Sequence, residues 1–198
     1  DMTIWEELDA AGSVLYNDGR TWECDREDVE GLLRAYQLDD RYPFSLWEVC
    51  YVNGSTAPGK VFVPAGGALA AKLDTIVTVV GPWRLRRGVS FRILPGGGYD
   101  PIWDSSGKRV THRSSSTSQH QYRPDVWQES PGKAGGTALD VQPKGDAQPN
   151  EDDISWLKAL DRKVSIIVYY PPDRGNFIHV DLRSGTPYRK RQYPKSVA

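Results

Sequence analysis

Residues 163–183 read KVSIIVYYPPDRGNFIHVDLR and contain the clearest structural pattern in the chain. Two runs rich in β-branched and aromatic residues, Val164–Tyr170 and Asn176–Leu182, flank a turn rich in proline and glycine. This pattern predicts a β-hairpin. Because side chains alternate along a strand, the second run places His179 and Asp181 on one face. A histidine and a carboxylate in that arrangement can hold a metal ion, or a water molecule beside one.

Two other segments carry side chains of the same chemistry. Asp140 ends the small-residue segment GTALD at residues 136–140, and His120 ends the tripeptide SQH at residues 118–120. Since imidazoles and carboxylates are common zinc ligands, we predict that His120, Asp140 and His179 converge on one zinc ion. Each residue also has a structural interpretation: His179 as a hydrogen-bonded core residue, Asp140 as a turn cap, and His120 as a solvated loop residue.

The composition of the 198-residue chain suits one domain. The 25 basic and 26 acidic residues nearly cancel, so the net charge of −1 does not favour nucleic acid or a membrane surface as a partner. The chain has no run of about 20 apolar residues that would span a membrane, and its first residues show no signal-peptide pattern. Cys24 and Cys50 are too few for a disulfide framework. We expect buried thiols, with a single disulfide as the alternative.

Periodicity along the chain predicts an α+β fold in which a small antiparallel sheet is flanked by helices. Residues 1–43 are expected to form an N-terminal helical extension, and residues 44–198 the main domain. One expected helix begins at Thr3, with Glu6 at capping-box spacing. Three more are expected at Asp25–Tyr36, at Pro64–Val80, which Gly81-Pro82 would end, and at residues 151–161. The expected strands are Trp83–Leu94, Thr137–Val141 and the two runs of the hairpin.

A long polar stretch at residues 99–135 shows no clear period, and long irregular stretches in compact domains are commonly functional or disordered. We expect an excursion over or beside the site rather than a second hydrophobic core, pinned to the body by Trp103, Tyr122 and Trp127. The glycines before it, Gly96–Gly98, are interpreted as a turn that requires positive φ. A phosphate-binding loop is disfavoured because no Lys-Ser/Thr pair follows them.

The order of these segments resembles the zinc D-alanyl-D-alanine carboxypeptidases and related peptidoglycan endopeptidases, the LAS-type metallopeptidases. Their signature reads Ser-x-His-x-x-Gly-x-Ala-x-Asp, followed at a distance by a histidine in a strand. Ser118–His120, Gly136–Asp140 and Phe177–Asp181 are similar to these three parts. The resemblance spans residues 44–193.

This resemblance implies a LAS-like fold and one zinc ion held by His120, Asp140 and His179. It also implies bacterial cell-wall peptide as the partner, so the protein would be extracytoplasmic or associated with a phage. The predicted function is zinc-dependent hydrolysis of peptide bonds in that material, of carboxypeptidase or endopeptidase type. The alternative is a non-catalytic descendant of this fold that serves as a binding or structural module.

Three positions depart from the family pattern. Lys133 stands where the family has its first histidine. Either a loop inserted within residues 122–135 leaves His120 as the ligand, or that ligand is lost. Asp100 replaces the arginine that binds a substrate carboxylate, and Asn176 stands where some relatives carry a catalytic glutamate.

These departures determine which side chains are expected to take part in catalysis. With no glutamate at position 176, Asp181 is the nearest candidate base, beside the open metal position. Arg123 is expected to steady an oxyanion or a substrate carboxylate, with Arg113 and Lys133 as alternatives.

Overall fold

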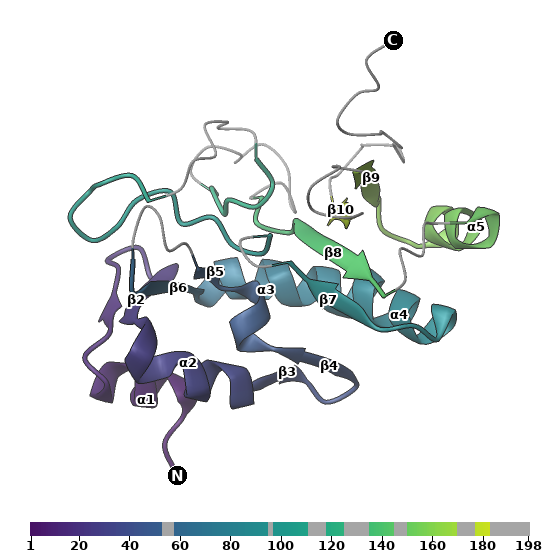
Figure 1. The fold of residues 1–198 in the computed structure, drawn as a ribbon. Coiled ribbons are helices and arrows are strands. Elements are labelled where there is room, and N and C mark those ends of the chain that lie inside the picture. The colour runs from purple at the N-terminus through teal and green to yellow at the C-terminus, as the bar shows by residue number, and fades with distance from the viewer. Residues whose placement is uncertain are drawn as a thin grey trace.

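The computed structural model describes residues 1–52, 58–94, 97–110, 118–124, 135–144, 150–169 and 177–182. Helices and antiparallel sheets in this part give an α+β architecture, which confirms the α+β class predicted from the sequence (Figure 1). No helix in these ranges is long and apolar enough to cross a membrane.

The two helices expected near the N-terminus are confirmed. Helix α1 (Ile4–Ala10) begins with a capping box, in which the Thr3 hydroxyl accepts a hydrogen bond from the Glu6 amide and the Glu6 carboxylate accepts one from the Thr3 amide. Helix α2 (Arg26–Ala35) buries Val29 and Leu33 on its inner face. Both helices lie beneath the first sheet in Figure 1.

The first sheet has no counterpart among the strands expected from the sequence. Its strand order is β1 (Val14–Leu15), β2 (Thr21–Asp25), β6 (Lys60–Pro64), β5 (Tyr51–Val52), and all pairs are antiparallel. A two-stranded ribbon of β3 (Gln37–Asp39) and β4 (Tyr42–Ser45) leads into a 3₁₀ turn at Leu46–Val49. The sheet and ribbon place part of residues 1–43 against the main body, and one hydrophobic core includes side chains from Ile4 to Leu182. The expected division at residue 43 stays a prediction, because packing alone does not define independently folding units.

The expected helix end at Gly81-Pro82 is wrong. Helix α3 (Gly66–Thr75) continues through a π-helical turn at Ile76–Val80 into helix α4 (Gly81–Arg87). Pro82 is tolerated because it lies in the first turn of α4. At Gly81 a side chain would collide with the ring of Tyr42, so this glycine permits close packing rather than ending the helix.

The strand expected at Trp83–Leu94 is therefore mostly wrong, because its first five residues lie in α4. Only β7 (Phe91–Ile93) is extended, and Trp83 lies in α4 with its ring 5.3 Å from the ring of Phe91. Gly88, in the left-handed conformation, ends the helix between them.

The second sheet matches the prediction closely. Its order is β7, β8 (Leu139–Pro143), β10 (Phe177–Asp181), β9 (Ser165–Tyr169), all antiparallel, so the hairpin pairing of β9 with β10 is confirmed. Helix α5 (Glu151–Ala159) precedes β9, as expected, and is capped by Asn150. Ile178 and Val180 on β10 are fully buried in the core.

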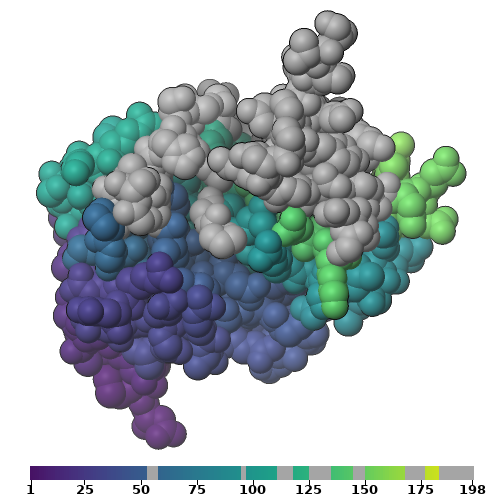
Figure 2. Space-filling view, viewed as in Figure 1, coloured from purple at the N-terminus to yellow at the C-terminus, as the bar shows by residue number. Residues whose placement is uncertain are grey.

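Within residues 99–135, the described parts lie over the first sheet rather than forming a large core of their own. Figure 2 shows them in teal above the purple and blue N-terminal residues. Val110 is buried against Tyr51 and Phe62 in a small cluster of three residues. Trp127 lies outside the described residues.

Both cysteines are buried and free. Cys24 lies on β2 and Cys50 follows the 3₁₀ turn, where its thiol donates to the Leu46 carbonyl. The interpretation as buried thiols is confirmed.

Candidate metal centre

Three predicted ligands come together in one buried cluster. His120, Asp140 and His179 each offer one ligating atom, and these atoms lie within 4.8 Å of one another. Oδ1 of Asp140 is 3.3 Å from Nε2 of His120 and 3.1 Å from Nδ1 of His179. The three residues are at most 9% exposed. This triad could hold a metal ion, and His120 is its first member in chain order.

The fold positions each ligand through backbone pairing. Asp140 on β8 and His179 on β10 are direct cross-strand partners, so both side chains lie on the same face of the sheet. His120 comes from the segment 118–124, which is tied to β8 because the amide of Ala138 donates to the carbonyl of Gln119. Segments far apart in the sequence therefore meet at the start of β8.

The outward-facing nitrogen of each imidazole has an acceptor. Nδ1 of His120 lies 3.0 Å from the carbonyl oxygen of Gly98, and Nε2 of His179 lies 2.8 Å from Oδ2 of Asp181. A carbonyl or a carboxylate accepts, so each of these nitrogens carries a proton. The second nitrogen of each ring faces Oδ1 of Asp140 and either donates to it or, once its proton is released, is free to bind a metal ion. Metal-binding histidines are oriented in this way by a carbonyl or carboxylate on the second nitrogen.

The electrostatics of the cluster favour positive charge at its centre. Burial alone would raise the pKa of the Asp140 carboxyl, but the rings of His120 and His179 hold this pKa far below its usual range. Burial alone would lower the pKa of His179, yet its hydrogen bonds to Asp140 and Asp181 raise that pKa above the ordinary value. Protons or a metal ion can supply the charge that this set of acceptors requires.

Lys72 supports the cluster and was missed by the sequence analysis. Its ammonium group is fully buried and donates to the carbonyls of Gly98 at 2.7 Å, Ala138 at 2.9 Å and His120 at 3.3 Å. These three carbonyls belong to the segments that carry or orient the ligands. The available signal was a lysine four residues before Ile76, on the apolar stripe of a helix, where a charge needs buried partners.

Two glycines allow close packing of the chain, Gly97 against Asp140 and Gly98 against Val49. A Cβ on Gly97 would lie 2.7 Å from Cβ of Asp140, and one on Gly98 would lie 2.9 Å from Cα of Val49. Neither glycine has positive φ, so the expected reason for them is wrong and close approach is the actual one. Gly96 lies outside the described residues.

Of the two residues expected to be catalytic, Asp181 contacts the triad directly, whereas Arg123 lies on the segment that carries His120. Asp181 is fully buried and contacts the ring nitrogen of His179 opposite the one that faces Asp140. Arg123 lines a cavity of about 250 Å³ beside the segment that carries His120. Their catalytic roles stay predictions. The residues Arg113, Lys133 and Asn176 lie outside the described ranges.

Asp100, the residue in place of the family arginine, is part of the local structure. It is buried and accepts hydrogen bonds from the amide of Ile102 and the side chain of Gln121. A carboxylate held in this way does not supply positive charge for a substrate carboxylate.

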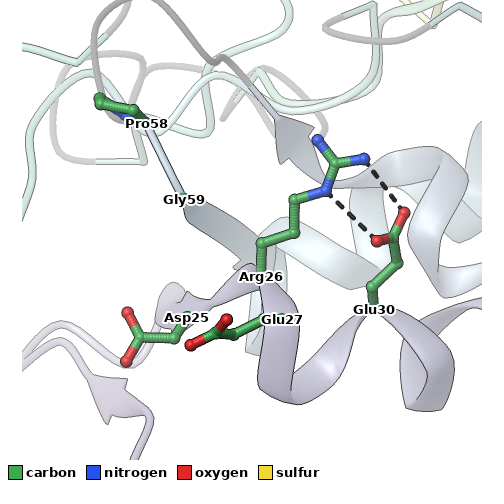
Figure 3. Close-up of a pocket in the computed structure, with 6 residues that line it drawn as sticks. All are labelled: Asp25, Arg26, Glu27, Glu30, Pro58 and Gly59. Atoms are coloured by element: carbon green, nitrogen blue, oxygen red, sulfur yellow. Dashed lines mark hydrogen bonds and ion pairs between the residues drawn. The ribbon is translucent and has the colours of Figure 1, made fainter.

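A second cavity lies at the start of α2, away from the triad segments (Figure 3). It is lined by Asp25, Arg26, Glu27, Glu30, Pro58 and Gly59. Arg26 points toward Glu30 and pairs with it at 3.1 Å, and Asp25 pairs with Lys60 at 2.7 Å. Nothing in this lining resembles a catalytic set.

No protein-family model matches the chain, and searches of curated proteins and of solved structures give no significant match. The geometry of the triad is therefore the main basis for a functional argument.

Proposed function

We propose that the chain is a zinc-dependent hydrolase of peptide bonds in bacterial cell-wall peptide, with a divergent LAS-type fold. One observation carries the proposal. His120, Asp140 and His179 converge, while Gly98 and Asp181 accept from the second nitrogen of each imidazole. This arrangement leaves the remaining nitrogen of each imidazole beside Asp140, where it can act as a metal ligand once its proton is released.

The donor set fits zinc. Zinc sites with three ligands from histidine and carboxylate residues typically keep a fourth position for water, which is the catalytic pattern. Two neutral imidazoles and one carboxylate would leave a net charge of +1. When bound, zinc lowers the pKa of its water to about 7 and polarises a carbonyl group.

The side chains around the triad have proposed roles of their own. The 2.8 Å contact supports Asp181 as a positioning residue that holds the proton on Nε2 of His179. Lys72 fixes the backbone from which His120 and Asp140 extend. Arg123 remains the proposed group that steadies an oxyanion or a substrate carboxylate.

The state of Asp100 favours an endopeptidase over a carboxypeptidase. A free peptide C-terminus needs a cation, and Asp100 is instead a buried carboxylate bound to Ile102 and Gln121. The same departure supports the second candidate, a non-catalytic binding or structural module with the same metal site.

Zinc content and wall hydrolysis together test the proposal. The purified chain is expected to carry one zinc per molecule by elemental analysis and to release peptides from purified peptidoglycan, detected by mass spectrometry. The variants His120→Ala, Asp140→Ala and His179→Ala should lose both properties. His112→Ala, which removes the third histidine of the chain, is the matched control and should retain both. Stoichiometric zinc without hydrolysis would favour the non-catalytic module, and no zinc uptake would overturn the metal site.

A further inference from the structure

A cavity lined by aromatic residues lies beside the segment that carries His120, and Arg123 is the one lining residue with a role in the proposed chemistry. Its volume is about 250 Å³, and its walls include Tyr16, Tyr99, Trp103 and Tyr122. These residues come from the first hairpin and from the two described segments that follow Gly98 and His120. Pockets for drug-sized ligands measure about 300–1,000 Å³, so this cavity suits a single ring-sized unit.

The cavity and the triad are built on the same backbone. Tyr99 follows Gly98, whose carbonyl accepts from His120, and Tyr122 lies two residues after His120. The amide of Asp100 donates to the carbonyl of His120 at 3.2 Å. A ligand that binds in the cavity is therefore held next to the segment that carries a metal ligand.

The charges of the walls do not favour a strongly charged ligand. Arg20 and Arg123 are offset by Asp18, Asp100 and Asp104, which gives a formal charge of −1 for the lining. These carboxylates also have contacts within the protein. Oδ2 of Asp18 lies 3.9 Å from Arg20, and Asp104 accepts from Ser106. A neutral ligand with many hydroxyl groups fits this mixture of aromatic faces and polar groups better than an anion does.

Trp103 lines the cavity and follows a residue with a strained backbone conformation. Its neighbour Ile102 has φ of +71°, in the left-handed region that a β-branched residue rarely adopts. Asp100 accepts from the amide of Ile102, and the hydroxyl of Tyr16 donates to the carbonyl of Trp103 at 3.1 Å. Trp103 nevertheless remains 49% exposed. Strain that the surroundings maintain is commonly found at ligand sites.

We propose that this cavity binds one sugar ring of a neutral oligosaccharide. The C–H groups of a pyranose carry partial positive charge and pack on the negative faces of aromatic rings, here led by Trp103. The Arg20 and Arg123 side chains and the carboxylates of the lining supply hydrogen-bonding groups for sugar hydroxyls. The choice of sugar rests on the proposed function. An N-acetylhexosamine of the wall glycan would bind here while its attached peptide reaches the triad.

A titration with tetra-N-acetylglucosamine tests the proposal on the full chain without metal. We expect shifts of the Trp103 indole signal in NMR spectra at sugar concentrations up to about 10 mM. Trp103→Ala should weaken binding at least about tenfold, and Trp103→Phe should recover part of it. Tyr36→Ala removes another exposed aromatic side chain, outside the cavity, and should bind as the wild type does. Thermal unfolding checks that each variant is folded.

The outcomes separate this site from the hydrolase. His179→Ala should lose zinc and hydrolysis yet bind the sugar normally. Sugar binding without hydrolysis would support the saccharide site and contradict the proposed hydrolase activity. Hydrolysis without sugar binding, sugar binding that ignores Trp103→Ala, or Trp103-dependent binding of a sugar-free wall peptide in place of the sugar would overturn the saccharide site.

Discussion

The ammonium group of Lys72 lies 2.7 Å from the carbonyl oxygen of Gly98, and the same oxygen accepts from Nδ1 of His120. A single carbonyl thus links a buried charge on α3 to a metal-ligand candidate on a distant loop. Lys72 also binds the carbonyls of His120 and Ala138, so one side chain fixes the backbone at two of the three ligand segments. The buried charge is satisfied by carbonyl oxygens that the surrounding loops direct inward.

Lys72→Met should destabilise the protein and weaken metal binding. The substitution keeps most of the apolar volume but leaves three buried carbonyls without this donor, so we expect a loss of about 2–4 kcal/mol in the free energy of unfolding. Lys60→Met is the matched control, because Lys60 forms an exposed ion pair with Asp25 and should contribute less than about 1 kcal/mol. Urea unfolding of both variants measures the difference. Equal effects for the two lysines would contradict the supporting role of Lys72.

Asp181→Asn should weaken zinc binding without removing it. The charged acceptor on Nε2 of His179 is replaced by a neutral one of the same shape, and such changes typically reduce metal affinity by about 10–100-fold. Competition with a chromogenic chelator measures the affinity. Asp152→Asn, on the exposed side of α5, is the control and should bind zinc as the wild type does.

The same variant distinguishes the two roles of Asp181. If Asp181→Asn retains full zinc affinity while hydrolysis falls sharply, Asp181 acts as the base predicted from the sequence. If affinity and activity fall together, and added zinc restores activity, it acts through His179.

Gly97→Ala should displace Asp140 with little effect on the rest of the fold. The added methyl group would lie 2.7 Å from Cβ of Asp140 and 3.0 Å from the carbonyl oxygen of Leu94, so one of these groups must move. We expect zinc affinity to fall at least about tenfold, as for other changes that misplace a ligand. Gly31→Ala is the control, since no atom lies within 4 Å of its added Cβ. In the middle of α2 this change should stabilise the protein by about 0.5–1 kcal/mol.

The parts of the site that sequence predicted are those with local signals. The alternation in residues 176–182 and the small-residue segment before Asp140 both specify strands, and a direct strand pair brings His179 opposite Asp140. His120 was found through a short motif, although its loop is joined to β8 by long-range hydrogen bonds.

The missed features depend on contacts between distant segments. Strand β2 pairs with β6 across about 40 residues of sequence, and strands β1 and β5 are only two residues long. No local hydrophobic period therefore predicts the first sheet. The helix continues through Gly81 and Pro82, and the absence of a side chain at Gly81 leaves room for the ring of Tyr42. The role of Lys72 likewise depends on three carbonyl groups from distant segments, which surround its ammonium group in the folded chain.

The two buried thiols predict a loss of stability at alkaline pH. Burial raises the pKa of Cys24 to about 11 and raises that of Cys50 as well. In the unfolded chain both thiols lose their protons near pH 8.5–9. Between about pH 9 and 11 the unfolded state therefore binds fewer protons than the native state, and the free energy of unfolding falls as pH rises. Each thiol can contribute at most about 1.4 kcal/mol per pH unit.

Cys24→Ala isolates this effect from other groups that titrate at alkaline pH. The variant should be less stable than the wild type at about pH 8, because a buried side chain is truncated. The difference should narrow as the pH is raised to about 10.5, since only the wild type loses the contribution of the Cys24 thiol. Urea unfolding at both pH values measures it, and a difference that stays constant would show that the Cys24 thiol ionises equally readily in both states. A native thiol with this pKa should also react slowly with a disulfide reagent at pH 8 and rapidly once the chain is unfolded.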